Sequence, residues 1–432
     1  MRSLILLFGF LGLFSCKKDK KETLAIAGQP NILLIIADDV GIDASPGYAV
    51  GSQLPKMPNL EKLMSEGLVF DNAWSFPVCS PTRASILTGK YGVHTGVLNA
   101  TNAATIGNNE LSIQRYLDNN TGQAYAHSIF GKWHLSNNAN SPTALGVGTY
   151  AGILRGAVPD YFNWTLTKDG KSNISTEYCT SQITDMAMEW IEAQTKPWFC
   201  WLGYTAAHTP LHLPPDSMHS QGALPSDSSS VNANPIPYFL AMIESIDFEL
   251  GRILNSLSAT ERANTVVIYI GDNGTSRQVL QGPYRPAQSK GSLYQGGIHV
   301  PLVVSGYGVE RKGERETALI NSADLFTTIS EIAGVETPVY ENSYSFKPLL
   351  YSAIAGKRKY NYSEVLSSDF TKSGYTIRDS QYKLIVFDDG MNVMYDLLAD
   401  AYESTNLLNG TLTAAENDAL LALQQEAQLI RN

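Results

Sequence analysis

The sequence predicts an α/β fold in which a large, mostly parallel central sheet is flanked by helices, with a small C-terminal antiparallel sheet plus helix. Three observations indicate this: continuous apolar runs typical of buried parallel strands, helical repeats between them, and short alternating strands near the C-terminus. The 432 residues are 44% hydrophobic and 17% charged, which suits a globular protein. We divide the chain into a signal segment (1–16), a tether (17–30), a main domain (31–355) and a C-terminal α+β subdomain (356–432).

The first residues are typical of an export signal. Arg2 precedes an apolar run over 4–14, which is shorter than the roughly 20 residues that a membrane-spanning helix needs. The run ends in Leu-Phe-Ser-Cys16 followed by lysines, and this resembles a bacterial lipoprotein signal (lipobox), cleaved before Cys16 and acylated on its thiol. An ordinary signal peptide with an incidental Cys16 is the alternative. We therefore expect export to the periplasm or cell surface, with a lipid anchor at Cys16.

The overall charge is acidic. The formal net charge is −10, which would repel a phosphate backbone unless a strong local basic patch compensated for it. The sequence contains no such patch. We expect no binding of nucleic acid.

Three apolar runs predict strands that are covered on both faces. They span 32–37, 198–203 and 266–270 and are rich in β-branched and aromatic residues. Ligands of parallel α/β sheets bind at the carboxyl ends of strands, so the residues that follow each run are candidates for a site. The polar residues that follow are Asp38 and Asp39 after the first run, His208 after the second, and Asp272 and Asn273 after the third.

Helices and loops are predicted between these runs. Apolar residues at helical spacing predict a helix near 60–64 that is stopped by Gly67, and another over 243–257. Two polar stretches, 136–175 and 209–237, are rich in Gly, Pro, Ser and Asn and predict long loops over the sheet. The predicted C-terminal elements are strands at 374–378, 382–387 and 393–396 and a helix at 413–430.

Three cysteines remain after the signal segment. An oxidising compartment can pair only two of them, so at least one stays unpaired. Cys179 lies in a helical pattern and Cys200 in an apolar strand, which favours two buried free thiols over a bridge between them. Cys79 stands in a different setting.

The most informative segment runs from Cys79 to Gly89. Pro81 suits a first helical turn and Gly89 a C-cap, so Cys79 is expected at a helix N-terminus, where free N–H groups favour anions. The segment resembles the signature of the type I sulfatases, Cys-x-Pro-x-Arg followed by Thr-Gly. In that family, which belongs to the alkaline phosphatase superfamily, a maturation enzyme oxidises the Cys to formylglycine (3-oxoalanine).

The resemblance extends over nearly the whole mature chain. It implies an alkaline phosphatase-like fold, a catalytic domain over 31–355 and the hydrolysis of sulfate monoesters, with a sulfated carbohydrate or other sulfated small molecule as substrate. The matching motifs, in order, are Asp38-Asp39, Gly131-Lys132-Trp133-His134, Ala207-His208-Thr209-Pro210, Gly271-Asp272-Asn273-Gly274, Lys290-Gly291-Ser292, Tyr395-Asp396-Leu397 and Asn406-Leu407.

The strand-end residues also predict a metal site. Asp38, Asp39, Asp272 and Asn273 supply three carboxylates and an amide oxygen, and such hard ligands suit Ca²⁺, with Mg²⁺ as the less suitable alternative. Zinc favours imidazole or thiolate, and the histidines keep a two-zinc phosphatase site open. The resemblance implies that the modified Cys79 also contacts the metal.

The resemblance assigns a role to each remaining residue. Arg83, one helical turn after the cysteine, and Lys132 would lie beside the hydrated aldehyde, which attacks sulfur as a covalent nucleophile. Lys290 and His208 would contact the sulfate, with His208 protonating the departing alcohol. His134 would remove a proton from the second hydroxyl, so that the enzyme–sulfate adduct expels sulfate and restores the aldehyde.

Two departures from the family pattern bear on substrate contacts. The Gly-Gly that often precedes the family lysine is absent before Lys290, and Ser136 stands where Gly is common. Rival hypotheses are a phosphonate or phosphate ester hydrolase of the same superfamily, and a surface glycan-binding lipoprotein without catalysis. Loop residues that could contact a sugar, although packing is the commoner role for each, are Tyr150, Arg155, Tyr161, Trp164, His212, Tyr284 and Arg285.

Overall fold

The computed structural model describes residues 29–101, 104–367 and 372–432. The predicted signal segment, Cys16 and nearly all of the tether therefore lie outside the described residues. Within the described ranges, no helix combines the length and apolar character needed to cross a bilayer.

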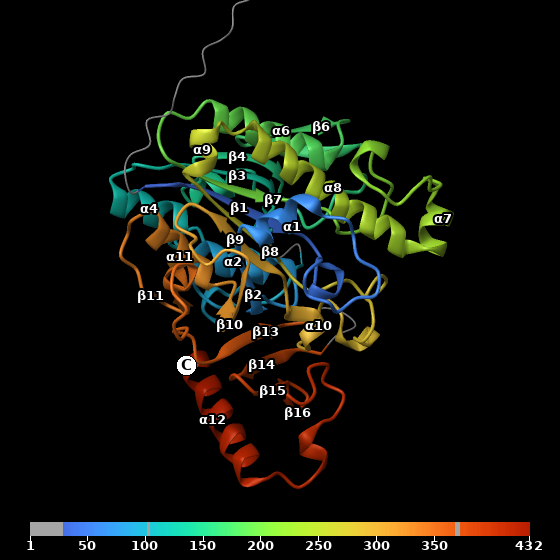
Figure 1. Ribbon diagram of the computed structural model, residues 1–432, viewed down its shortest axis with the longest axis vertical. Coiled ribbons are helices and arrows are strands. Elements are labelled where there is room, and N and C mark those ends of the chain that lie inside the picture. The colour runs from blue at the N-terminus through green and yellow to red at the C-terminus, as the bar shows by residue number, and fades with distance from the viewer. Residues whose placement is uncertain (1–28, 102–103, 368–371) are drawn as a thin grey trace, which may run out of the picture.

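A ten-stranded sheet forms the centre of the protein, in the order β10-β2-β9-β8-β1-β7-β3-β4-β5-β6 (Figure 1). Neighbours from β8 to β4 are all parallel, whereas β9 runs antiparallel to both of its neighbours. The large, mostly parallel sheet is confirmed. Its strands are β1 (Asn31–Ala37), β2 (Gly67–Trp74), β3 (Ala126–Lys132), β4 (Thr149–Ile153), β5 (Trp164–Lys168), β6 (Lys171–Ser175), β7 (Trp198–Gly203), β8 (Thr265–Gly271), β9 (Leu302–Gly306) and β10 (Glu314–Asn321).

Helices cover both faces of the sheet, which explains why β1 is apolar at every position. Leu33 and Ile35 pack in one core with α1, α6 and α8, whereas Ile32 and Leu34 pack in a second core with α2, α4 and α11. Successive side chains of a strand point to opposite faces, so a strand buried on both faces needs no polar residue. These helices are α1 (Pro58–Ser65), α2 (Cys79–Thr88), α4 (Ile113–Thr121), α6 (Cys179–Glu192), α8 (Pro235–Ser256) and α11 (Asp324–Ile332).

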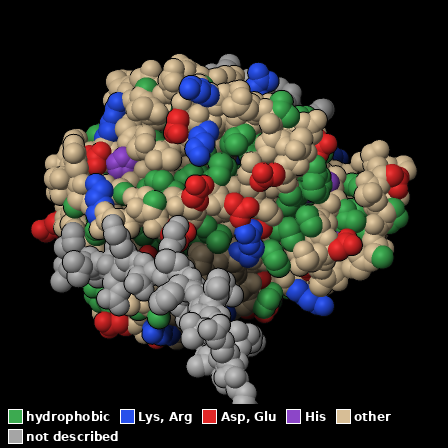
Figure 2. Space-filling view, turned by 90° about the horizontal axis from the view of Figure 1, so that it is seen from above, with side chains coloured by type: hydrophobic (Ala, Val, Ile, Leu, Met, Phe, Trp, Pro, Cys, Tyr) green, Lys and Arg blue, Asp and Glu red, His purple; other side chains and the backbone are tan. Residues whose placement is uncertain are grey.

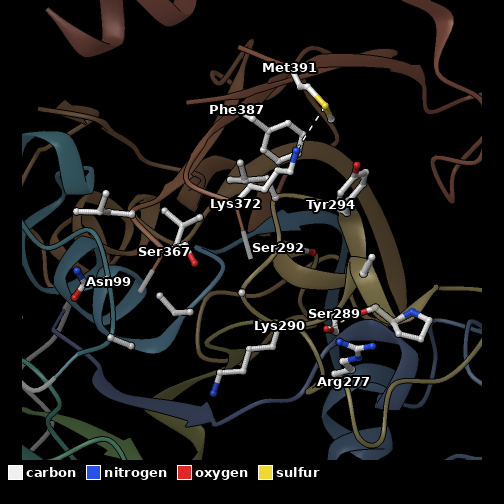
Figure 3. A pocket seen from close by; sticks show the side chains of 18 residues that line it. Asn99, Arg277, Ser289, Lys290, Ser292, Tyr294, Ser367, Lys372, Phe387 and Met391 are labelled. Carbon is white, nitrogen blue, oxygen red and sulfur yellow. Dashed lines mark hydrogen bonds between the residues drawn. The ribbon is translucent and has the colours of Figure 1, made fainter. Parts of the chain in front are cut away.

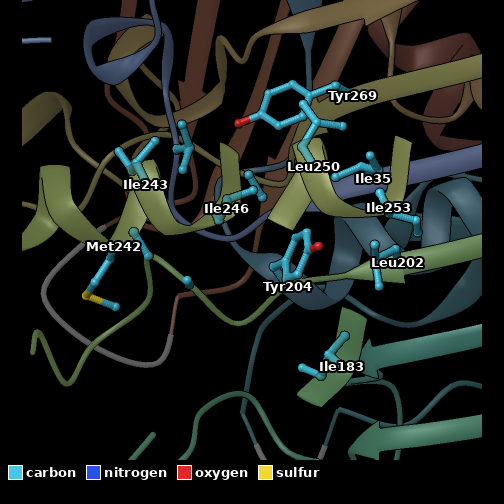
Figure 4. Packing of buried hydrophobic residues seen from close by; sticks show 14 of the residues in the cluster. Ile35, Ile183, Leu202, Tyr204, Met242, Ile243, Ile246, Leu250, Ile253 and Tyr269 are labelled. Atoms are coloured by element: carbon cyan, nitrogen blue, oxygen red, sulfur yellow. The ribbon is translucent and has the colours of Figure 1, made fainter. Parts of the chain in front are cut away.

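Figure 4 shows the first of these cores, in which α8 lies over the sheet. Its Ile246, Leu250 and Ile253 face Ile35 and Leu202 of the central strands, and all five side chains are fully buried. Burial of a large apolar side chain contributes about 1.5–3 kcal/mol, so this row anchors α8 to the sheet. The predicted helix over 243–257 is confirmed, although α8 begins at Pro235.

The predicted long loop over 136–175 is wrong. It contains α5 (Ser141–Ala144) and the strands β4, β5 and β6, which extend the sheet to its edge. The edge strand β6 exposes most of its side chains, β5 exposes some, and β4 is buried but only five residues long, so no long apolar run marks these strands. The stretch 209–237 is irregular over most of its length but also contains α7 (Ser228–Ala233) and the start of α8.

The C-terminal segment forms a second, four-stranded antiparallel sheet at the lower end of the protein in Figure 1. The predicted strands and helix are confirmed, and β13 adds a strand that the sequence did not indicate. Leu423 and Ala427 of α12 pack against Ile377 and Leu384 of the sheet. The elements are β13 (Asn361–Val365), β14 (Gly374–Arg378), β15 (Tyr382–Phe387), β16 (Asn392–Asp396) and α12 (Ala414–Arg431). The domain boundary at 355/356 stays a prediction.

The other short α-helices and strands of the described fold are α3 (Gly92–Thr95), α9 (Ala259–Ala263), α10 (Gln295–Ile298), β11 (Val339–Tyr340) and β12 (Ser343–Tyr344). At the end of the protein opposite the C-terminal sheet, Figure 2 shows acidic, basic and apolar side chains interspersed. Cys179, the first residue of α6, and Cys200 in β7 are buried free thiols, as expected.

Candidate active site

The candidate active site lies at the carboxyl ends of four adjacent parallel strands, β8, β1, β7 and β3. Asp272 directly follows β8, Asp38 directly follows β1, and Lys132 is the last residue of β3. Because Ala37 pairs with Gly271, the two aspartates leave the sheet side by side. The strand ends thus meet at one edge of the sheet, as the sequence predicts.

Helix α2 places Cys79 against these carboxylates. Cys79 is the first residue of the helix, and Gly89 ends it in the left-handed conformation, with φ of 71°. The Cys79 Sγ lies 3.4 Å from Asp38 Oδ1 and 3.3 Å from Lys132 Nζ. The predicted helix start and its closeness to the strand ends are both present in the structure.

Basic side chains pair with the carboxylates. Lys132 Nζ bonds to Asp38 Oδ2, and Lys290 Nζ lies 2.5 Å from Asp39 Oδ1. The same Asp39 oxygen accepts a hydrogen bond from Asn273 Nδ2 at 2.8 Å. The residues expected to bind sulfate and metal are therefore in direct contact with one another.

Arg83 is fully buried and connects two strand ends of the site through its hydrogen bonds. Its Nη2 and Nε donate to Asp272 Oδ2 at 2.8 and 3.2 Å, and its Nη1 donates to the Lys132 carbonyl at 2.8 Å. These bonds fix the ends of β8 and β3 with respect to α2. The sequence predicts a contact of Arg83 with the group at position 79, but the hydrogen bonds of its guanidinium go to Asp272 and Lys132.

The tautomer of His208 follows from one hydrogen bond. Its Nδ1 lies 2.7 Å from the Thr209 carbonyl oxygen, which can only accept, so Nδ1 donates and Nε2 carries the lone pair. Burial lowers the pKa of His208 to about 3, and Lys290 acts in the same direction. His208 is therefore a neutral imidazole when no anion is bound.

His134 follows β3 in a left-handed conformation, with φ of 52°. Its Nδ1 is buried and has no hydrogen-bond partner among the described residues. Burial lowers the pKa of His134 well below its usual value, and Lys132 adds to the effect. Gly156 lies against the ring, since a Cβ there would stand 2.4 Å from Cε1.

The buried acids are not electrostatically equivalent. Burial and the neighbouring Asp272 raise the pKa of Asp38 to about 8, because three carboxylates share one small volume. Burial would also raise the pKa of Asp39, but Lys290 holds it below its usual value. Burial raises the pKa of the Cys79 thiol to about 12, so the unmodified side chain is a neutral thiol and a poor nucleophile.

A group of four side chains could hold a metal ion. Ligand atoms of Asp38, Asp39, Cys79 and His208 all lie within 4.8 Å of one another. Asp272 lies just outside this group: its Oδ1 accepts a hydrogen bond from the backbone N–H of Asp39 at 3.2 Å. His208, which the sequence assigns to proton transfer, stands within the group.

The donor set fits a hard divalent cation. The Oδ1 of Asn273 is buried and has no hydrogen-bond partner among the described residues, while its Nδ2 donates to Asp39. An unpaired buried amide oxygen next to crowded carboxylates is what an oxygen-ligated Ca²⁺ would satisfy. The residues that the sequence proposed for the metal therefore suit it.

A supporting network escaped the sequence analysis. Asp43 is buried and accepts a hydrogen bond from Thr275 Oγ1 at 2.7 Å, and Thr275 Oγ1 in turn accepts one from the Gly41 N–H at 3.2 Å. This network ties the loop after β1 to the loop after β8. Their positions in the sequence could have indicated this role, because Asp43 and Thr275 follow the proposed metal ligands within four residues.

Most of the loop residues considered for sugar contact are packing residues. Tyr150, Trp164 and Tyr284 are buried. Tyr161 is buried too, and its hydroxyl donates to the His208 carbonyl at 2.7 Å, so it supports the loop of that histidine. His212 stacks on the Tyr161 ring at 4.1 Å.

Comparison with known families gives two matches. The family described as Sulfatase matches residues 30–335, which include every proposed site residue. The family described as N-sulphoglucosamine sulphohydrolase, C-terminal, matches residues 288–428.

Individual proteins are similar over almost the whole chain. An N-acetylglucosamine-6-O-sulfatase of Bacteroides thetaiotaomicron is 25% identical, with 99% of this chain and 90% of the relative aligned. A structure described as a complex with its substrate D-glucosamine-2-N,6-O-disulfate matches with a TM-score of 0.75 and 21% identity, covering 93% of this chain and 98% of the other. A phosphonate monoester hydrolase of Agrobacterium radiobacter matches with a TM-score of 0.71 and 19% identity, covering 93% and 95%. The two structures share the fold.

Proposed function

The chain belongs to the sulfatase family, and we propose that it releases sulfate from sulfated carbohydrates by means of a formylglycine residue made from Cys79. As a sulfatase it is a sulfuric ester hydrolase. One observation carries the mechanistic proposal: Cys79 opens α2 within 3.4 Å of both Asp38 and Lys132. A helix N-terminus beside buried cations suits a sulfate ester, because N–H groups and positive charges both favour anions.

We assign the metal site to oxygen ligands of Asp38, Asp39, Asp272 and Asn273, together with the modified residue 79. Three carboxylates suit Ca²⁺ better than Mg²⁺, which demands stricter octahedral geometry. When bound, the cation would polarise a sulfate oxygen and neutralise part of its charge. The presence of His208 in the same donor group keeps zinc as the alternative, so metal analysis of the purified protein is the direct test.

The remaining residues divide into two groups around the sulfate. A formylglycine hydrate would supply two hydroxyls, one for attack on sulfur and one for the later release of sulfate. Lys132 is placed to orient these hydroxyls, and His134 to take the proton that release requires. His208 and Lys290 would bind the sulfate on the other side, where His208 passes a proton to the departing alcohol. The negative charge of the bound ester would raise the pKa of His208 towards neutrality.

The names of relatives support a carbohydrate substrate. The relative from Bacteroides thetaiotaomicron is called an N-acetylglucosamine-6-O-sulfatase. The similar structure with a TM-score of 0.75 is described as a complex with a disulfated glucosamine. Export would bring the enzyme to sulfated glycans outside the cytoplasm. We propose a sulfated sugar as substrate and test it by measuring sulfate release from a panel of sulfated monosaccharides.

A phosphonate or phosphate ester hydrolase is the second candidate, because a phosphonate monoester hydrolase shares the fold at a TM-score of 0.71. The two chemistries differ in the charge of the substrate. Parallel assays on aryl sulfate, phosphate and phosphonate esters separate them. A kcat/KM that is higher for a phosphorus ester than for the sulfate ester would favour this second candidate.

Export and anchoring are part of the proposal. We propose cleavage before Cys16, acylation of its thiol, and residence in the periplasm or at the cell surface. A Cys16→Ala variant should lose its partition into the membrane fraction. If the variant still sediments with membranes, the lipid anchor is wrong.

Conversion of Cys79 by a formylglycine-generating maturation enzyme is the decisive test of the mechanism. Mass spectrometry of the peptide that contains residue 79, from cells with and without that enzyme, should detect the aldehyde only in the first case. Sulfate release should follow the converted fraction. Full activity in protein with an unmodified Cys79 would overturn the mechanism.

A further inference from the structure

A cavity of about 630 Å³ adjoins the active site, between the loop after β8, the segment that leads into α10, and the C-terminal sheet. It meets the catalytic residues at two points: Lys290 lines it and also contacts Asp39, and Val78 lines it and precedes Cys79. Cavities of this volume are typical of small-molecule sites. Since the sulfate would lie at Lys290, the organic part of the ester can extend into this cavity.

The lining has an unusual charge for this protein. The chain carries a net charge of −10, yet the described side chains that line the cavity include Arg277, Lys290 and Lys372 and no carboxylate among them. The rest of the lining is largely apolar, with Tyr294 and Phe387 among its members. In Figure 3, Lys290 and Arg277 lie at one end of the cavity, and Lys372 and Phe387 at the other. Such a surface suits a ligand that combines anionic groups with an apolar ring face.

Two of the three cations already have partners. Lys290 pairs with Asp39, and Lys372 pairs with Asp389 at 2.6 Å while its Nζ lies over the Phe387 ring. Arg277 is exposed and makes no hydrogen bond or ion pair within the described part of the chain. It lies in the loop after β8, four residues after Asn273. The unpaired charge therefore stands on the same loop as the proposed metal ligands.

We infer that Arg277 binds a second anionic group of the substrate, so that the preferred substrate is a sugar sulfate carrying a further sulfate or carboxylate. The inference rests on the proposed function. A guanidinium presents paired donors that match a sulfate or carboxylate, which a lysine does not. The apolar part of the lining would contact the organic part of the substrate.

The experiment compares N-acetylglucosamine-6-O-sulfate with D-glucosamine-2-N,6-O-disulfate, in which an anionic N-sulfate replaces the neutral N-acetyl group. We expect Arg277→Gln to lower kcat/KM for the disulfate about 10- to 100-fold and to change the value for the monosulfate less than about 3-fold. Arg277→Lys should recover part of the loss. Arg262→Ala is the matched control, since it removes one positive charge from α9, at the end of β8 opposite to Asp272, and should affect both probes equally.

Binding gives a readout that does not depend on turnover. Calorimetric titration of the inactive Cys79→Ser variant with each probe should show the same selective loss of affinity when Arg277→Gln is added. Equal losses for the two probes, or none for the disulfate, would overturn the role of Arg277. A wild-type enzyme that releases sulfate from neither probe nor from an aryl sulfate would instead contradict the proposed function on which the inference stands.

Discussion

Two buried charge clusters of this protein each contain aspartate paired with arginine, and they differ in how completely their polar groups are paired. At Asp324, both carboxylate oxygens accept hydrogen bonds, from Arg358 and from the backbone N–H groups of Asn321 and Tyr344. Arg358 in turn donates to the Tyr91 hydroxyl at 2.6 Å. Every buried polar group named here has its partner.

In the active-site cluster, by contrast, some buried polar atoms have no hydrogen-bond partner among the described residues. Three carboxylates crowd together, the pKa of Asp38 is raised to about 8 by burial and by Asp272, and the Oδ1 of Asn273 and the Nδ1 of His134 have no partner in the described structure. A cluster that only stabilises the fold has no reason to leave buried groups unsatisfied. Of these two clusters, only the active-site cluster combines crowded carboxylates with buried polar atoms that lack a partner among the described residues, which supports the proposal that it binds a cation.

The largest expected effect is on catalysis. Cys79→Ala should lower sulfate release by more than about 10³-fold, because it removes the residue that becomes the nucleophile. The apparent melting temperature of the metal-free protein should change by only a few degrees. Activity within 10-fold of wild type would show that residue 79 is not the nucleophile, and that the active-site cluster does not have the catalytic role proposed for it.

The paired cluster should respond in the opposite way. Arg358→Met leaves Asp324 buried without its cation, so the free energy of unfolding should fall by about 3–5 kcal/mol in urea titrations. Activity per folded molecule should stay near wild type, since Arg358 touches no active-site residue. The double variant Arg358→Met with Asp324→Asn should be less destabilised than the single one, because it removes the unpaired charge and keeps an acceptor oxygen for a backbone N–H. A larger loss in the double variant would show that the pair is not the source of the effect.

Metal should distinguish the two clusters. Saturating Ca²⁺ should stabilise the wild type by about 2.7 kcal/mol at 100 times its Kd, because it binds only the folded state. Asp39→Asn should lose most of this gain, whereas Asp324→Asn should be less stable overall yet keep it. Thermal unfolding with and without chelator measures both. A Ca²⁺ shift that persists unchanged in Asp39→Asn would place the cation elsewhere.

Asp43 is a third case for the comparison: its carboxylate is buried, but no cationic side chain pairs with it among the described residues. Burial raises its pKa from 3.8 to about 6, so the neutral form contributes stability that is fully present below about pH 4 and is lost as the pH rises through 6. In metal-free protein, the wild type should lose about 1–3 kcal/mol relative to Asp43→Asn between pH 4 and 7. Urea titrations at several pH values measure this difference, and parallel pH profiles of the two proteins would show that Asp43 does not titrate there.

The elements with strong local patterns were predictable from sequence. The apolar runs that form β1, β7 and β8 are buried on both faces, so almost every residue in them is apolar and indicates a buried strand. The strands β4, β5 and β6 were missed because none forms a long apolar run: β4 is buried but only five residues long, and β5 and β6 leave side chains exposed. The same limit hid β13, whose strand character depends on the neighbouring β14.

The sequence by itself determined which chemical groups gather at the site, since acids at the ends of buried parallel strands and a cysteine at a helix start are local features. Only the tertiary structure decided which partner each group has. Arg83 bonds to Asp272, 189 residues away, and His208 joins the donor group, because the lateral order of the strands fixes these contacts. The cavity at Arg277 likewise exists only because the C-terminal sheet packs beside the loop after β8. Local sequence encodes burial and backbone conformation, whereas pairing between distant side chains depends on how the strands and sheets assemble.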